Sequence, residues 1–145
     1  MVKLAYRIKE LDEFKEQFPD YKKYDVDLYI DQSDPKVTKK ITSFLNAKEK
    51  KFKRILHVIL SGKYDNDFYS QEGREIGIKH VTALKFKGRS NKNTRIYCKE
   101  IFQDGKKVVL ITPLSKKVQK NNNAINNLLR SIEQSTYELK EKPKT

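Results

Sequence analysis

The spacing of apolar residues changes along the chain, and each period predicts a different element. Over residues 24–31 apolar side chains alternate with three aspartates, which predicts a half-buried strand. The two-residue period returns over 84–87, where two apolar residues alternate with two lysines, and continues over 94–102. Asp104-Gly105 then predicts a tight hairpin turn. Residues 107–112 are apolar on both faces and therefore predict a central strand.

Helical spacing occupies the segment between the first strand and the later ones. Asp34, which precedes a proline, is expected to cap a helix. Apolar residues recur at helical spacing over 37–45 and again over 52–59, with the polar stretch 46–51 between them. The segment is therefore interpreted as two helices, or as one broken helix, ending at Gly62.

Four further segments are placed by weaker patterns. Residues 1–23 carry a short helical spacing and are interpreted as an N-terminal extension. Residues 63–79 have no clear period and are predicted to form a mobile loop. An apolar stripe over 125–132 predicts a closing helix. The charged tail, 138–145, is expected to be frayed.

The order of these elements predicts the fold class. A strand is followed by helices, then by a three-strand antiparallel meander, then by a helix, and such segregation is typical of an α+β domain. We therefore expect one domain over residues 1–145. Its antiparallel sheet would combine the N-terminal strand with the three C-terminal strands and carry helices packed on one face.

Charge is the property of the composition that most narrows the function. Lys and Arg number 32 against 19 Asp and Glu, which gives a net charge of +13. Such an excess attracts polyanions, so nucleic acid is the leading partner, an acidic protein the second and a membrane surface the third. We expect no membrane partner, because no apolar run has the length of a signal peptide or a bilayer span.

The single cysteine and the two histidines suggest little catalytic chemistry of their own. Cys98 can form no internal disulfide and no cysteine-based zinc site, which suits a reducing cytoplasm, so the expected location is cytoplasmic. Cys98 is interpreted as inert core, and His57 as a packed structural histidine. His80 opens a strand near the basic residues and is a candidate RNA contact. No metal and no cofactor are predicted.

Strand alternation predicts one basic patch. It places Arg95, Tyr97 and Lys99 opposite the apolar residues Ile96, Cys98 and Phe102 of the same strand. Lysines at the same period, and a lysine-rich loop, would extend and rim the patch: Lys85, Lys87, Lys116, Lys117 and Lys120. Cations position phosphates, and a tyrosine ring can stack on a base. The alternative is an ordinary solvated sheet face.

The patch could also carry chemistry. Cleavage of RNA needs a base for the 2′-hydroxyl, cations around the phosphate and an acid for the leaving oxygen. A lysine crowded by other cations has a lowered pKa and can become a base, whereas arginine keeps its charge and suits the phosphate.

Residues 80–137 resemble the RelE/ParE-like superfamily of bacterial toxins, nearest the RelE and HigB-type members. The resemblance is carried by short segments: Ala83-Leu84-Lys85-Phe86-Lys87-Gly88, Thr94-Arg95-Ile96-Tyr97-Cys98, Val108-Val109-Leu110-Ile111 and Ser115-Lys116-Lys117. The family pattern is a basic strand, a strand with arginine two positions before an aromatic residue, an apolar central strand, a basic loop and a closing helix.

What the resemblance implies is a RelE-like fold and a toxin of a toxin–antitoxin pair, which cleaves mRNA on the ribosome without a metal. The implied partners are mRNA and a cognate antitoxin protein. Arg95 matches the arginine opposite the scissile phosphate, and with Lys85, Lys87 and Lys117 it forms the expected catalytic set. The expected RNA-binding set is Tyr97, Lys99, Lys116, Lys120 and His80. The acid and base stay unassigned, since Tyr137 cannot be placed beside the patch.

Three functions remain open at this point. The first is a ribosome-dependent endonuclease, the second a non-catalytic member of the same fold that binds a protein such as gyrase, and the third a plain RNA-binding module. Clustering of Lys85, Lys87 and Arg95 in one concave site favours the first function. An apolar groove favours the second, and scattered cations on a flat sheet face favour the third.

Overall fold

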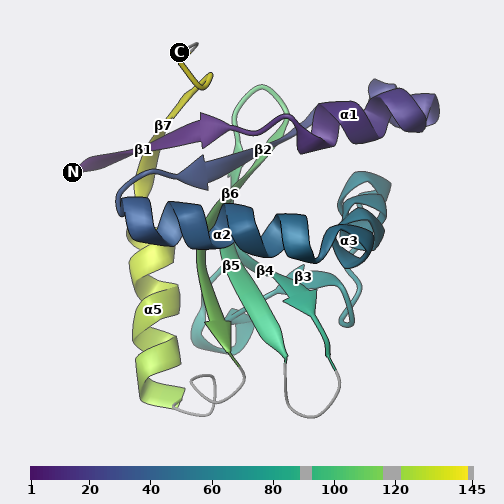
Figure 1. Cartoon of the computed structure of the whole chain (residues 1–145). Coiled ribbons are helices and arrows are strands. Elements are labelled where there is room, and N and C mark those ends of the chain that lie inside the picture. Colours follow the sequence, from purple (N-terminus) through teal and green to yellow (C-terminus); the bar gives the residue numbers. More distant parts are fainter. Residues whose placement is uncertain (89–92, 116–121, 144–145) are drawn as a thin grey trace.

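The chain folds as an α+β protein around one mixed sheet, shown as a computed structural model in Figure 1. The structure describes residues 1–88, 93–115 and 122–143. Its strands are β1 (Val2–Arg7), β2 (Val26–Asp31), β3 (Tyr69–Gln71), β4 (Val81–Phe86), β5 (Thr94–Phe102), β6 (Lys106–Ser115) and β7 (Thr136–Lys140). Its helices are α1 (Glu10–Gln17), α2 (Pro35–Ala47), α3 (Glu49–Ser61) and α5 (Asn122–Gln134), with short 3-10 turns at Pro19–Lys23 and Arg74–Ile76.

The sequence predicts an antiparallel sheet, but the sheet is mixed. Within the described residues it has seven strands in the order β3-β4-β5-β6-β2-β1-β7. The meander β3-β4-β5-β6 is antiparallel, but β2 pairs parallel with β6 and β7 pairs parallel with β1. Strand β6 lies inside the sheet with its middle residues fully buried, so the backbone groups on both of its edges need a pairing strand. The chain supplies the second neighbour, β2, from before the two helices.

The hairpin between β5 and β6 is confirmed. Residues 103–105 join the two strands, and Asp104 and Gly105 have φ of 52° and 97°, so both occupy the left-handed region that tight hairpin loops use. A Cβ at Gly105 would also lie 2.4 Å from the carbonyl oxygen of Asp25. Only glycine fits this turn without displacing the neighbouring backbone. Phe102, at the hairpin end, is exposed and not on an apolar face, since it lies beside the turn.

Of the two alternatives left open for residues 35–61, the structure has two helices, α2 and α3, and they cover one face of the sheet. The Asp34 side chain accepts a hydrogen bond from the backbone N–H of Lys36, and Gly62 ends α3 with a φ of 76°. Figure 1 shows α2 crossing in front of the strands. The main core lies between these helices and the sheet, where residues such as Ile41, Ile55 and Leu84 are fully buried.

The expectation that helices pack on one face only is wrong, because α5 packs on the other face. Leu129 and Ile132 of α5 form a second buried cluster with Val81, Ala83 and Tyr97. Both β4 and β5 have apolar residues on each face, so the sheet's second face also needs a cover. This cover decides how much of the predicted basic patch remains accessible.

Three segments outside the expected core are ordered parts of the fold. Residues 1–23, interpreted as an extension, supply β1 and α1. The expected loop at 63–79 contains β3, which pairs with β4. The expectation of a frayed tail over 138–145 is wrong for residues 138–140, because residues 136–140 form β7 along β1. Within the described ranges, no helix is long and apolar enough to cross a membrane.

Candidate functional site

Strand register brings two of the predicted cations together. Lys85 of β4 and Arg95 of β5 are directly opposite in the antiparallel pairing, so their side chains leave the same face of the sheet. Like charges in this position repel each other. A stable sheet therefore needs a counter-charge close to both side chains.

Glu72 supplies that counter-charge from the residue after β3. Its Oε1 lies 2.9 Å from Nη1 of Arg95 and 4.0 Å from Nζ of Lys85. The Lys85 ammonium also donates to the carbonyl oxygen of Asn66 at 3.0 Å. The backbone N–H of Glu72 donates to the carbonyl oxygen of Val81, which fixes the carboxylate beside β4. This cluster of Glu72, Lys85 and Arg95 is called the charged triad below.

Burial shifts the pKa values of two members of the charged triad. The side chains of Glu72 and Lys85 are 16% and 10% exposed. Loss of solvation raises the pKa of Glu72 above its ordinary value, although the nearby Arg95 opposes this rise. Loss of solvation likewise lowers the pKa of Lys85. Both pKa values therefore shift toward neutral pH, the range in which a side chain transfers protons most effectively.

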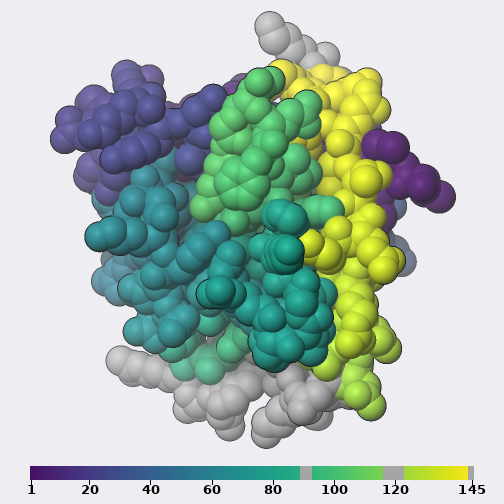
Figure 2. All heavy atoms as spheres, turned by 180° about the vertical axis from the view of Figure 1, so that it is seen from behind, coloured from purple at the N-terminus to yellow at the C-terminus, as the bar shows by residue number. Residues whose placement is uncertain are grey.

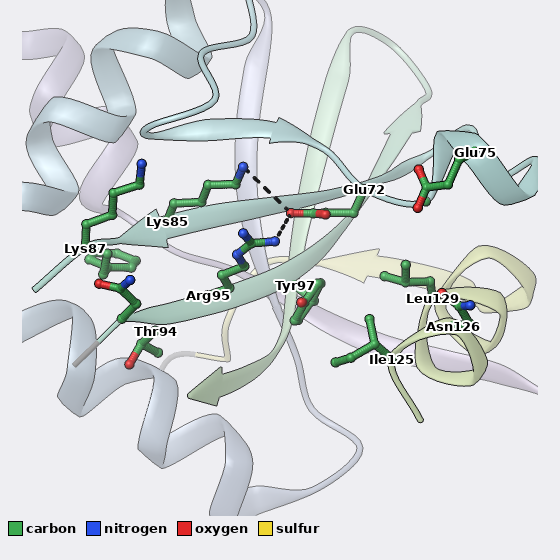
Figure 3. A pocket seen from close by; sticks show the side chains of 13 residues that line it. Glu72, Glu75, Lys85, Lys87, Thr94, Arg95, Tyr97, Ile125, Asn126 and Leu129 are labelled. Atoms are coloured by element: carbon green, nitrogen blue, oxygen red, sulfur yellow. Dashed lines mark hydrogen bonds and ion pairs between the residues drawn. The ribbon is translucent and has the colours of Figure 1, made fainter. Parts of the chain in front are cut away.

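The charged triad lines a pocket of about 360 Å³. Figure 3 shows Lys85, Lys87 and Arg95 at one end and residues of α5 at the other, with Tyr97 between them. The other lining residues are Gly73, Glu75, Phe86, Asn93, Thr94, Ile125, Asn126 and Leu129. Three of the four predicted catalytic residues thus line one hollow. The fourth, Lys117, lies outside the described residues, as do Lys116 and Lys120.

Lys87 is the most exposed of the three cations. Its side chain is 56% exposed, and Nζ lies 2.5 Å from Oδ1 of Asp67, which is itself exposed. An ion pair in this setting contributes little stability and exchanges readily with another anion. Lys87 is therefore available to a phosphate at the rim of the pocket.

Tyr97 and Lys99 do not form the exposed aromatic patch that alternation suggested. Tyr97 is 1% exposed beneath α5, so its ring offers no open face to a base. Lys99 donates to the carbonyl oxygens of Glu133 and Ser135 at 2.7 Å and 2.5 Å, where α5 ends. A lysine there stabilises the unpaired carbonyls of a helix terminus. Both corrections have the same cause, which is that α5 covers this face.

His80 also binds α5. Its Nδ1 lies 2.8 Å from Oε1 of Glu133, and its backbone N–H donates to Oε2 of the same carboxylate at 3.0 Å. Figure 2, from the side opposite to Figure 1, shows this part of the chain (teal) against the end of α5 and the start of β7 (yellow). His80 therefore tethers the helix, and it is not a lining residue of the pocket.

The remaining singled-out residues lie away from the pocket. His57 lies among aromatic rings and hydrogen-bonds Tyr21 through Nδ1 at 2.9 Å. Cys98 is fully buried in the main core. The Tyr137 hydroxyl donates to Oδ2 of Asp31 at 2.5 Å, on β7 at the far edge of the sheet. Tyr137 is thus not the acid or base of this pocket.

Sequence reasoning missed the acidic and amide residues of the pocket. Glu72 and Glu75 lie in the segment interpreted as a mobile loop, and Asn126 was passed over among the asparagines that begin α5. Because Lys85 and Arg95 face each other, a carboxylate must lie nearby, and this requirement could have indicated Glu72. It could be used only once the register of β4 and β5 was known.

The charged triad combines a proton acceptor, a proton donor and a fixed cation. Glu72 can accept a proton, Lys85 can donate one, and Arg95 can hold two oxygens of a phosphate in its planar fork. No group of three His, Cys, Asp or Glu side chains in residues 1–88, 93–115 and 122–143 is arranged to hold a metal ion. Comparison with protein-family models, curated proteins and solved structures found no match to this chain.

Proposed function

We propose that this protein is an endoribonuclease that binds RNA at the charged triad and cleaves it without a metal ion. The observation that carries the proposal is the convergence of Lys85, Arg95 and Glu72 in one pocket. The resemblance to RelE/ParE-like toxins supports it independently, since Arg95 matches the phosphate-facing arginine. The net charge of +13 supports a polyanionic substrate.

The cleavage step uses the three side chains in separate roles. The Glu72 carboxylate accepts the proton of the 2′-hydroxyl, and the 2′-oxygen forms a bond to phosphorus. The bond from phosphorus to the 5′-oxygen breaks, and that oxygen takes a proton from the Lys85 ammonium. Arg95 binds the non-bridging oxygens as charge develops on them. The products are a 2′,3′-cyclic phosphate and a 5′-hydroxyl end.

Glu72 suits the role of base better than the crowded lysine that the sequence suggested. The Lys85 pKa is lowered, first by burial, but Lys85 also faces a carboxylate, which favours its charged form. A protonated Lys85 is then an acid. Glu72 with its raised pKa is a stronger base than an exposed carboxylate.

The biological setting of the proposal follows the resemblance. The substrate would be mRNA on the ribosome, and an antitoxin protein would mask the protein until it is needed. The same charge that attracts message would otherwise hold any RNA. Co-purification of a small acidic partner, and arrest of growth when the protein is expressed alone, are the expected results.

The test compares wild type with Arg95→Ala and Arg95→Lys on RNA alone and in a translating extract. Arg95→Ala should lower cleavage by about 100-fold or more, because one fixed cation at the reacting phosphate is lost. Arg95→Lys should restore part of the activity, since an ammonium lacks the planar fork. The control is Lys142→Ala, an exposed residue beyond β7, at the other edge of the sheet.

Melting temperatures show whether each variant is folded. Arg95 is 36% exposed and paired with Glu72, so its loss should lower stability by only about 1 kcal/mol. Folded Arg95→Ala protein that cleaves like wild type would overturn the site. A 2′-deoxy linkage at the cut position should block cleavage, and continued cleavage there would overturn the step.

Binding without cleavage is the second candidate function. Arg95 and Lys85 both face Glu72, so the charged triad could serve as an internally paired structural cluster beside an RNA-binding rim. In that case wild type would bind RNA with a salt-dependent affinity and leave it intact, with or without ribosomes.

A further inference from the structure

The pocket has two chemically different ends. The charged triad and Lys87 form one end, on β4 and β5 and the segment after β3. The other end is formed by α5, where Ile125 and Leu129 lie four residues apart on one face of the helix, and Asn126, three residues before Leu129, lies beside them. A ligand that fills the pocket must therefore carry a charged group beside an apolar group with polar edges.

A single nucleotide has that composition. With the phosphate at the charged end, the attached base would lie toward α5, against Ile125 and Leu129. The volume of about 360 Å³ lies at the lower end of the range for small-ligand pockets, which suits one nucleotide unit. Apolar side chains cover the faces of a base but do not distinguish one base from another.

Asn126 is the residue at this end that can distinguish bases. It is half-buried, and its side-chain amide has no hydrogen-bond partner among the residues that the structure describes. An asparagine amide offers a donor and an acceptor side by side. That pair matches the N7 acceptor and the N6 amino donor of adenine, and bidentate pairing of this kind is a recurrent mode of adenine recognition.

We propose that the α5 end of the pocket binds the base next to the scissile phosphate and that Asn126 selects adenine there. The inference rests on the proposed function and adds a specificity-determining residue to it. The base is held by Ile125 and Leu129 and read by the Asn126 amide. The phosphate is held by Arg95 and Lys85.

The matched variants are Asn126→Ala, Asn126→Asp and the control Asn127→Ala. Asn127 is exposed on the same helix, is not a lining residue of the pocket, and accepts a long 3.5 Å hydrogen bond from Arg130. Alanine is well tolerated in helices, so these variants should fold. The probes are RNAs identical except for A, G, C or U at one position, and the same RNAs with a 2′-deoxy linkage at the cut site.

Wild type should cut beside A about 10- to 100-fold faster than beside the other bases. Asn126→Ala should reduce that preference to within a few-fold, and Asn126→Asp should shift it to a base with more donors, because a carboxylate only accepts. Asn127→Ala should behave as wild type. The uncleavable RNAs should show the same order in binding.

Failure of this inference is separable from failure of the proposed function. Wild type that cuts all four RNAs equally, or Asn126→Ala that keeps the preference for A, would overturn the role of Asn126 while cleavage stands. Wild type that binds the uncleavable RNAs with a preference for A but cuts none would overturn the cleavage proposal and support the base site. Wild type that neither binds nor cuts any of the RNAs would overturn both.

Discussion

Replacement of Glu72 by glutamine separates its role in cleavage from its role in folding. Glutamine keeps the shape of the side chain and an oxygen that can accept from Arg95, but it cannot accept a proton at neutral pH. Glu72 faces both Arg95 and Lys85, at 2.9 Å and 4.0 Å. The variant therefore removes one proton acceptor and one charge while it leaves the packing of the pocket unchanged.

The two effects of Glu72→Gln differ in size and sign. Loss of a general base lowers the rate by about 100- to 10,000-fold, or roughly 3 to 5 kcal/mol in the barrier. In the folding balance, removal of a carboxylate whose pKa is raised by burial favours the native state. Loss of the partly exposed ion pair with Arg95, together with the repulsion then left between Lys85 and Arg95, opposes this by about 1 to 2 kcal/mol. The net change should stay within about 1 kcal/mol, or about 4 °C in Tm.

The pH dependence of stability gives a second measure of the same substitution. Because the folded-state pKa of Glu72 lies above its ordinary value of 4.5, the folded protein binds this proton more tightly than the unfolded chain. Stability from Glu72 is thus fully present below the unfolded-state pKa and is lost as pH rises through the folded-state pKa. Glu72→Gln lacks that loss, so its stability relative to wild type should increase over this window.

The assay pairs single-turnover cleavage with urea unfolding for wild type, Glu72→Gln and Glu75→Gln. Glu75 lines the same pocket but is exposed, and in the described part of the chain its carboxylate forms no ion pair with Arg95, so its variant controls for the loss of one negative charge near Glu72. Glu72→Gln that remains folded and cleaves at the wild-type rate would refute the assignment of Glu72 as the base. A loss of several kcal/mol in stability would show that the ion pair is mainly structural.

The remaining predictions concern pH, salt and the buried network that holds β3. The cleavage rate should follow a bell-shaped pH profile that rises as Glu72 ionises and falls as Lys85 loses its proton. Because burial moves the pKa values of both groups toward neutral, the bell should be narrower than for exposed groups. A flat profile from pH 5 to pH 10 would contradict the proposed proton transfers. Lys87→Ala should make the slope of the logarithm of the RNA-binding constant against the logarithm of salt concentration shallower by about 0.7, as titrations at several salt concentrations will measure. Urea unfolding should show a loss of less than about 0.5 kcal/mol in stability. Glu100→Ala should lower the free energy of unfolding by about 3 to 5 kcal/mol. Glu100 is 2% exposed, and its loss leaves the Lys106 ammonium, 2.9 Å away, without this counter-charge. A decrease of less than about 1 kcal/mol in urea unfolding would contradict this prediction.

Much of the local structure could be predicted from the sequence. The alternation over 24–31 gives β2, the cap at Asp34 begins α2, and Gly62 ends α3. Asp104-Gly105 forms the hairpin, and β6 is buried on both faces, as its apolar run indicates. These features depend on residues close together in the chain, where strand period, capping and turn geometry act directly.

Part of the candidate site could also be predicted. Alternation placed Lys85, Lys87 and Arg95 on one face, and they do line one pocket. The same rule failed for Tyr97 and Lys99, which share that face but lie under or against α5. Strand period fixes the face from which a side chain leaves the sheet. It carries no information on which other element covers that face.

The tertiary structure alone decided the contacts between distant segments. The parallel pairing of β2 with β6, the addition of β7 to β1 and the position of Glu72, 23 residues before Arg95, join parts of the chain with no shared local pattern. Each is selected by what it satisfies: a free strand edge, or two facing cations. An unpaired strand edge and a pair of facing cations exist only after the sheet has assembled. The proposed general base, Glu72, and the proposed specificity residue, Asn126, both lie in segments that reach the pocket by packing on the assembled sheet.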